Sequence, residues 1–374
     1  MTRKQTVLIT GGYGFIGTNL VRLLVQSGTY RVVNLDVLTY AANPLSLADL
    51  EGNPDYVFVK GNIMDRELVS SLLATHEPVG LLHLAAESHV DRSIVNAEDF
   101  IQTNVVGTYS MLEAARAYWN ALPAGQKSAF RFLHVSTDEV FGSLGENGYF
   151  SEETPYAPNS PYAASKAASD HFVRAFHHTY GLPTVITNCS NNYGPYQFPE
   201  KLIPLMILNA LSGKPLPVYG TGSNVRDWIY VEDHCRAVKL AFEKGKPGEV
   251  YGIGANNEQK NIDLVNQICS ILDDIAPPME VPQLRERGLN SYSELTRFVA
   301  DRLGHDHRYA VDSAKITREL GWRAEVQFEA GLRRTIEWYL SNPKWVDQAS
   351  AGSYAEWIEK NYGWRAEGPE KESK

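Results

Sequence analysis

The sequence predicts an α/β fold built on a parallel, doubly wound sheet, with a smaller and mostly helical C-terminal lobe. A short apolar run over residues 6–10 ends directly at a glycine cluster, a pattern typical of a strand buried on both faces. Strand-like and helix-like segments then alternate up to about residue 187, which favours parallel strands joined by helices. The second strand-like segment ends in an acid, Asp36, at the edge where such sheets bind ligands.

The first half of the chain supplies six expected strands and the helices between them. The strands are expected over residues 6–10, 31–36, 56–60, 80–84, 130–135 and 182–187. Helices are expected over residues 15–27, 65–74, 103–119 and 160–180. The last helix opens with Ser160 and Pro161, which are typical of an N-cap and a first-turn position.

The pattern changes after Asn188, where prolines and aromatic residues become frequent. A helix over residues 230–243 and a strand over 250–253 return to the sheet, and further helices are expected over 262–275, 313–320 and 328–340. We therefore predict one domain over residues 1–187 and 225–255, a second lobe over 188–224 and 256–350, and a disordered tail over 367–374. The cleft between the two is the expected site.

Composition excludes several classes of protein. The net charge of −9 argues against nonspecific binding of nucleic acid. The three cysteines, Cys189, Cys235 and Cys269, are widely spaced and indicate neither a disulfide framework nor a metal knuckle. The chain shows no signal-peptide core and no apolar run long enough to span a bilayer. We expect a cytoplasmic protein that binds no membrane.

Three glycines after the first strand predict a dinucleotide site. Gly11, Gly14 and Gly17 have the spacing G-x-x-G-x-x-G and open a helix, whose free N–H groups and dipole favour phosphate. Asp36 stands where a ribose-binding acid belongs, and its charge would repel a 2′-phosphate. We therefore predict an NAD-binding Rossmann domain rather than an NADP-binding one. The alternative is a glycine turn without a ligand.

Two further strand ends carry residues that suit the same cofactor. Small residues after the fourth strand leave room for a ligand across the strand tips, and the third strand is followed by a polar residue and an apolar one. Taken singly, each group could equally be ordinary packing. The residues after the fourth strand are Leu84, Ala85 and Ala86, and those after the third strand are Asn62 and Ile63.

A second motif predicts the chemistry. Tyr162 and Lys166 are four apart and lie on one face of a helix, where the ammonium is expected to lower the pKa of the phenol. Such a base deprotonates an alcohol while hydride leaves. Thr137, Asp138 and Glu139 end the fifth strand, and two adjacent carboxylates indicate chemistry beyond redox. Alternatively, Thr137, Asp138 and Glu139 form an ordinary polar loop, and Tyr162 and Lys166 are an exposed pair on a helix.

The glycine fingerprint together with Tyr162 and Lys166 resembles the extended short-chain dehydrogenase/reductase family. Longer matches make the chain similar to the nucleotide-sugar 4,6-dehydratases of that family, and the resemblance extends to about residue 340. Related 4-epimerases and decarboxylases share the tyrosine and lysine but lack the Asp138-Glu139 pair. The matching strings cover residues 38–41, 83–93, 137–142, 188–196, 198–204, 226–234 and 301–305.

The resemblance implies an internal redox cycle on dTDP-glucose. Tyr162 would take the proton of the hydroxyl at carbon 4, with Thr137 bound to the same oxygen and Lys166 holding the phenolate and the nicotinamide ribose. Hydride would pass to a tightly bound NAD. Glu139 would then remove the proton at carbon 5 and Asp138 would protonate the departing hydroxyl at carbon 6. Return of the hydride to carbon 6 would give a 4-keto-6-deoxy sugar.

The resemblance also implies the remaining binding residues. Additional cofactor contacts are expected from Phe15, Ile16, Thr39, Ser88, Thr103 and Asn192. The substrate pocket is expected to include Ser88, Thr137, Asn191, Lys201, Leu202, Pro217, Tyr219, Arg226, Asn261, Asp301, Arg302 and His305. Arg226 could bind the diphosphate through two hydrogen bonds, or it could form a surface ion pair with Asp227. No metal is expected.

Other functions remain open from the sequence. The same dehydration could act on a UDP- or CDP-hexose, because the sequence does not show which residues recognise the nucleotide base. A nucleotide-sugar 4-epimerase or a silent, NAD-sensing binding protein are further alternatives. The resemblance implies a homodimer formed through the helices near residues 103–119 and 161–180.

Overall fold

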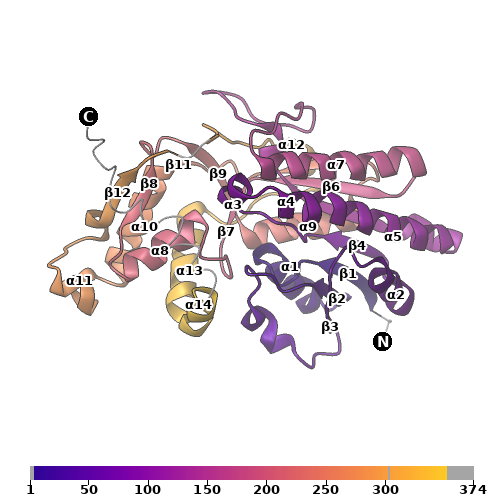
Figure 1. Ribbon diagram of the computed structural model, residues 1–374, viewed down its shortest axis with the longest axis horizontal. Coiled ribbons are helices and arrows are strands. Elements are labelled where there is room, and N and C mark those ends of the chain that lie inside the picture. Colours follow the sequence, from indigo (N-terminus) through magenta and orange to yellow (C-terminus); the bar gives the residue numbers. More distant parts are fainter. Residues whose placement is uncertain (1–3, 302–303, 352–374) are drawn as a thin grey trace.

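Seven parallel strands form the central sheet of the computed structural model, which describes residues 4–301 and 304–351 (Figure 1). The sheet order is β10-β6-β5-β4-β1-β2-β3, and β1 lies between β4 and β2. The order therefore reverses beside β1, where open α/β sheets bind ligands at the carboxyl ends of the strands. In that order, the strands are Val250–Ile253, Thr184–Cys189, Arg131–Thr137, Gly80–His83, Gln5–Thr10, Tyr30–Asp36 and Tyr56–Lys60.

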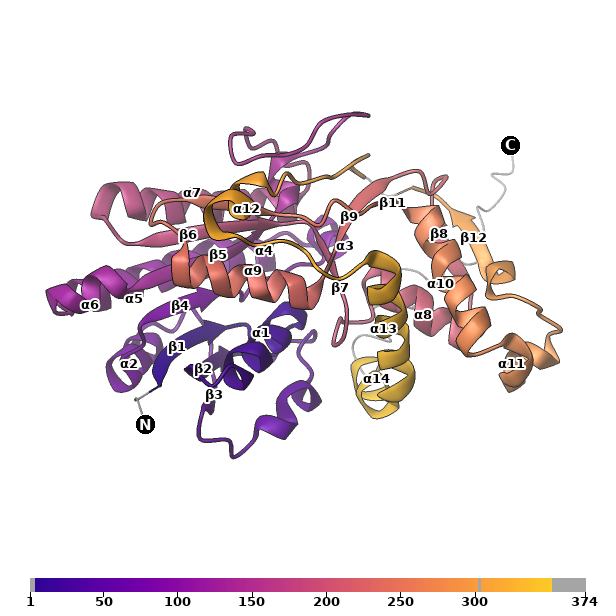
Figure 2. The same cartoon turned by 180° about the vertical axis from the view of Figure 1, so that it is seen from behind.

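Helices cover both faces of the sheet (Figures 1 and 2). One face packs against α1 (Phe15–Gln26), α9 (Val231–Lys244) and α12 (Ala314–Leu320). The other packs against α2 (Arg66–His76), α5 (Thr108–Ala121) and α7 (Pro161–Tyr180). Because both faces are covered, β5 and β6 are buried along almost their whole length. The predicted doubly wound α/β fold is confirmed.

Local signals set the helix ends. The Ser160 hydroxyl accepts a hydrogen bond from the Ala163 amide at the start of α7, and Gly181 ends that helix with a φ of +74°. The helix expected over residues 103–119 begins earlier, in a π-helical turn, η2 (Ile101–Gly107), that leads into α5. The segments around it form α3 (Val90–Val95), α4 (Glu98–Phe100) and α6 (Ala124–Ala129), and η1 (Pro44–Leu50) follows β2.

A second, mostly helical lobe lies beside the sheet domain (Figure 1). It has its own apolar core. Its helices are α8 (Leu202–Leu211), α10 (Asn261–Ile275), α11 (Pro282–Glu286), α13 (Phe328–Ser341) and α14 (Pro343–Ala349), with short turns η4 (Pro278–Glu280) and η5 (Tyr292–Leu295). Two small sheets, which the sequence did not predict, complete this part of the molecule. One pairs β8 (Leu216–Tyr219) with β12 (Thr296–Val299), and the other joins β7 (Asn191–Tyr193), β9 (Val225–Tyr230) and β11 (Glu258–Lys260).

The two parts are interleaved along the chain. Strand β9 was predicted to belong to the first domain but pairs with β7 and β11, whereas α12, predicted in the second lobe, packs on α9 and β10. The domain boundaries themselves stay a prediction. The tail predicted over residues 367–374 lies outside the described residues. Within the described ranges, no helix combines the length and hydropathy needed to cross a bilayer.

Candidate active site

The glycine loop packs the start of α1 closely against the sheet. Gly11 has a φ of +75°, and a Cβ there would lie 2.7 Å from the Ala85 backbone. A Cβ on Gly17 would lie 2.1 Å from the Gly11 carbonyl oxygen, whereas one on Gly14 would meet that oxygen at 3.3 Å. The loop therefore has no room for side chains at its first and third glycines, and the α1 N-terminus opens toward the cleft with its free N–H groups.

Asp36 fixes the other side of the same loop. Its carboxylate accepts hydrogen bonds from the Tyr13 amide at 2.9 Å and from the Leu38 amide at 2.8 Å. Burial raises the pKa of Asp36, and the two backbone donors oppose that rise. The remaining oxygen lone pairs can accept hydrogen bonds from ribose hydroxyls, so this loop fits the NAD that the sequence predicts.

A cavity of about 330 Å³ runs from the glycine loop across the carboxyl ends of β1, β2, β4, β5 and β6. Every residue predicted to contact the cofactor lines it, as do the five predicted catalytic residues. Of the predicted substrate residues, Ser88, Thr137, Asn191 and Lys201 also line it. The remaining predicted substrate residues do not line the cavity, and Arg302 lies outside the described residues.

Thr137 and Asp138 are held together where β5 ends. The Thr137 hydroxyl accepts from the Glu139 amide at 3.2 Å and donates to Asp138 Oδ1 at 3.3 Å, and η3 (Asp138–Phe141) follows. Burial raises the pKa of Asp138 well above its usual value, and the charges of Glu139 and Asp227 raise it further. Arg226 and the Thr137 hydrogen bond act in the opposite direction. Burial and the neighbouring carboxylates therefore favour the protonated form of Asp138.

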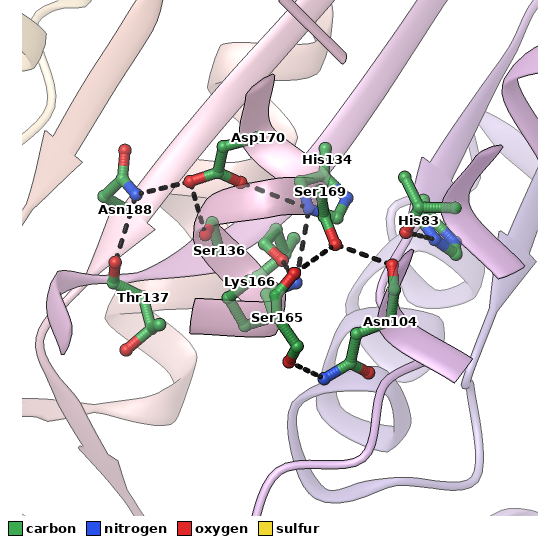
Figure 3. A network of polar contacts seen from close by, with 12 residues as sticks. His83, Asn104, His134, Ser136, Thr137, Ser165, Lys166, Ser169, Asp170 and Asn188 are labelled. Atoms are coloured by element: carbon green, nitrogen blue, oxygen red, sulfur yellow. Dashed lines mark hydrogen bonds and ion pairs between the residues drawn. The ribbon is translucent and has the colours of Figure 1, made fainter. Parts of the chain in front are cut away.

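The environment of Tyr162 corrects one expectation. Burial raises the pKa of the Tyr162 phenol well above its usual value, and the charge of Glu139 adds to the rise. The predicted lowering of the Tyr162 pKa by Lys166 is therefore wrong. Lys166 instead donates to the Val135 carbonyl at 2.9 Å, so its ammonium is directed at the strand (Figure 3).

Arg226 is not the surface group that one alternative required. It is buried, and its guanidinium donates to the carbonyls of Val225 at 2.8 Å and Asp306 at 2.9 Å. The guanidinium also lies 4.2 Å from the centre of the Tyr309 ring. Arg226 is thus fixed in orientation on β9, close enough to Asp138 to influence its pKa.

Sequence relatives identify the family. The family described as GDP-mannose 4,6 dehydratase matches residues 8–335. A dTDP-glucose 4,6-dehydratase of Xanthomonas campestris pv. campestris strain B100 is 59% identical over 349 residues, which cover 93% of this chain and 97% of that protein. The dTDP-glucose 4,6-dehydratase 1 of Escherichia coli K12 is 55% identical over 365 residues, covering 95% and 98%. The chain belongs to the dTDP-glucose 4,6-dehydratase family.

Solved structures share the fold of this dehydratase family. The dTDP-glucose 4,6-dehydratase of Streptomyces venezuelae with NAD and TYD bound has a TM-score of 0.79 and 46% identity, covering 91% of this chain and 98% of that one. A UDP-glucose 4-epimerase of Thermotoga maritima with UDP-glucose has a TM-score of 0.77 and 27% identity, covering 91% and 100%. One architecture thus carries both reactions, so the side chains of the cleft decide the chemistry.

Several outer residues that the sequence predicts to bind substrate lie on or beside α8, β8 and β12. Lys201 donates to the Ser88 carbonyl at 2.7 Å, which ties the segment before α8 to the loop after β4. Tyr219 at the end of β8 lies 6.0 Å, ring centre to ring centre, from His305. His305 Nδ1 lies 2.6 Å from Asp301 Oδ1. The predicted substrate residues Tyr219, Asp301 and His305 therefore lie close together at the ends of β8 and β12.

Some residues of the cleft were not predicted as functional. Cys189 ends β6 and lines the cavity, and the rule that ligands gather at the carboxyl ends of parallel strands could have found it. Gln197 and Glu200 also line it, from a loop for which the sequence gives no such rule. His134, which the sequence places inside a strand as a core histidine, is buried 3.2 Å from Lys166 Nζ.

Proposed function

We propose that the protein converts dTDP-glucose to dTDP-4-keto-6-deoxyglucose with NAD as its bound cofactor. The observation that carries this proposal is the buried Asp138 beside Glu139, both on the wall of the cavity that Tyr162 lines. Burial and the charge of Glu139 raise the pKa of Asp138, which suits a general acid. An epimerase needs no acid and base for elimination, so this pair favours dehydration. The family membership supports the same reading.

The cofactor half of the cavity suits NAD. The pyrophosphate would lie on the glycine loop at the start of α1, the adenine ribose at Asp36, and the nicotinamide ribose at Lys166. When bound, NAD supplies the group that accepts hydride from carbon 4 and returns it to carbon 6.

The oxidation needs a base at the hydroxyl of carbon 4. Tyr162 takes that proton while the Thr137 hydroxyl hydrogen-bonds the same sugar oxygen. A phenolate in this buried position requires a positive charge nearby, because burial and Glu139 both favour the neutral phenol. Lys166, one turn further along α7, places an ammonium on the same cavity.

The elimination uses the two carboxyl groups in opposite roles. Once carbon 4 is a ketone, the hydrogen at carbon 5 is acidic and Glu139 removes it as a proton. The bond from carbon 6 to its hydroxyl breaks, Asp138 gives its proton to that hydroxyl, and water leaves. After reduction at carbon 6, Glu139 returns a proton to carbon 5. Proton transfers of this kind each contribute about 100- to 10,000-fold to the rate.

The test is incubation of the purified protein with dTDP-glucose, UDP-glucose or CDP-glucose, without added reductant. We expect the base-dependent absorbance of a 4-keto-6-deoxy sugar with dTDP-glucose. Absence of that product with every nucleotide sugar would sink the proposal, and a preference for UDP- or CDP-glucose would change the substrate but keep the reaction. A Glu139→Gln variant with wild-type turnover would remove Glu139 from its role.

We also propose that the protein is a cytoplasmic homodimer. Exposed apolar side chains gather on η2, α5 and α7, which pack side by side on one face of the sheet. They are Ile101, Val106, Tyr109, Phe172 and Tyr180. A second copy would cover them through a two-fold interface. Light scattering of wild type and a Phe172→Glu variant tests this, with a dimer and a monomer expected. The free, buried cysteines suit a reducing compartment.

A further inference from the structure

A buried polar network lies behind Lys166 (Figure 3). Lys166 Nζ lies 3.2 Å from His134 Nε2, and the same ring nitrogen lies 3.3 Å from Asp170 Oδ1. Lys166 and Asp170 are one turn apart on α7, whereas His134 belongs to β5. All three side chains are buried. The reaction assigned above uses Lys166 but neither of the other two.

Asp170 is built to be an anion. Its Oδ2 accepts hydrogen bonds from the Ser136 hydroxyl at 2.8 Å and the Asn188 amide at 3.3 Å (Figure 3). The same oxygen accepts a third hydrogen bond from the Tyr156 hydroxyl at 2.9 Å. Three donors on one carboxylate oxygen favour the ionised form. A buried anion is stable only beside compensating donors or cations.

His134 separates this anion from the ammonium. Burial lowers the pKa of His134 to about 4, so its imidazole is neutral. Nε2 can offer Asp170 a hydrogen or Lys166 a lone pair, but not both at once. In either state the ring lies between the two charges, so Asp170 acts on Lys166 through its field.

We propose that Asp170 is a positioning residue of the reaction, an anion held behind His134 that keeps Lys166 charged in the dry cleft. Lys166 alone would lose its proton readily, since burial lowers its pKa to about 8 even with Asp170 opposing that shift. The proposal rests on the proposed function, in which the Lys166 charge makes the Tyr162 phenolate possible.

Glu139 on η3 lines the same cavity as Lys166 and is unchanged in both variants of the test below. The titratable groups that neighbour Lys166 on β4, β6 and α7 have pKa values shifted toward their neutral forms. His83 on β4 stacks on His134 with ring centres 5.3 Å apart, and burial lowers its pKa well below the usual value. Cys189 on β6 has its pKa raised to about 12 by burial. On α7 itself, burial raises the pKa of Tyr162. Asp170, with three hydrogen-bond donors on one carboxylate oxygen, is therefore the group in this set built to carry negative charge.

The test compares Asp170→Asn with Tyr156→Phe, which removes one donor to Asp170 but keeps the charge. Acetic anhydride labels only neutral amines, so the pH dependence of Lys166 labelling in the cofactor-free protein, read by peptide mass spectrometry, reports its pKa. We expect the midpoint to fall by about one pH unit or more in Asp170→Asn, a tenfold change in the charged-to-neutral ratio, and to stay in place in Tyr156→Phe.

Turnover of dTDP-glucose supplies the second readout. In Asp170→Asn the alkaline limb of kcat should move by the same amount, with about a fivefold loss near pH 8, about a tenfold loss near pH 9 and almost no loss near pH 6. A folded Asp170→Asn variant with an unmoved labelling midpoint and alkaline limb would overturn the proposal. If that variant does not fold, Asp170→Glu keeps the charge, and a midpoint that falls there would overturn it equally. A wild-type protein without product would refute the proposed function alone.

Discussion

Replacing Asp138 by asparagine separates the oxidation from the elimination. Asparagine has nearly the same shape and no proton to give, so loss of the general acid should slow product formation by about 100- to 10,000-fold. Burial and Glu139 raise the pKa of Asp138 and so favour its neutral form, which an uncharged asparagine side chain resembles. The Thr137 hydroxyl can still donate to the amide oxygen that takes the place of Oδ1. The free energy of unfolding should therefore change by no more than about 1 kcal/mol.

The assay follows product and hydrogen exchange in the same D₂O reaction. With Asp138→Asn, Tyr162 and Glu139 remain, so dTDP-glucose should take up deuterium at carbon 5 faster than it forms product. The matched Glu139→Gln variant should give neither exchange nor product. The reasoning fails if Asp138→Asn forms product at a rate near that of wild type, or if it abolishes the exchange as completely as Glu139→Gln does.

Three further predictions concern the cofactor loop and the pH profile. Gly17→Ala would place a Cβ 2.1 Å from the Gly11 carbonyl oxygen, so this variant should melt at a lower temperature and should be purified with less NAD than wild type. A Gly125→Ala control, where a Cβ would meet nothing within 4 Å, should keep both the melting temperature and the NAD. Asp36→Asn should weaken NAD binding and reduce the preference for NAD over NADP, as measured by calorimetric titration. Unchanged affinities for both cofactors would contradict the role of Asp36 at the adenine ribose. Activity should fall as pH rises through about 8, because Lys166 is charged only below its pKa; a rate still rising at pH 9 would exclude that role.

Features that depend on neighbouring residues were readable from the sequence. The strand, glycine loop and helix at the N-terminus form a continuous segment, and Asp36 follows at the end of the next strand. Ser160 caps α7 as its sequence context predicts, because the capping bond spans three residues. The position of Thr137 at a strand end follows from the same local pattern.

Features that depend on distant residues were not readable. The sheet of β7, β9 and β11 joins segments that are apart in sequence, and none of the three shows a strong strand pattern alone. The direction of the Tyr162 pKa shift depends on burial and on Glu139, whereas the spacing of Tyr162 and Lys166 conveys only their shared helix face. Asp170 stands four residues after Lys166, so its position was visible, but its three hydrogen-bond donors come from β5, β6 and a loop.

The most direct test of the central claim follows one hydrogen atom. Wild-type protein is incubated with dTDP-glucose carrying deuterium at carbon 4, and the product is analysed by NMR. If Asp138 and Glu139 place an elimination between the two hydride transfers, the deuterium appears in the new methyl group at carbon 6 of a 4-keto sugar. Deuterium retained at carbon 4 of a galactose isomer, or lost to solvent, would contradict this account.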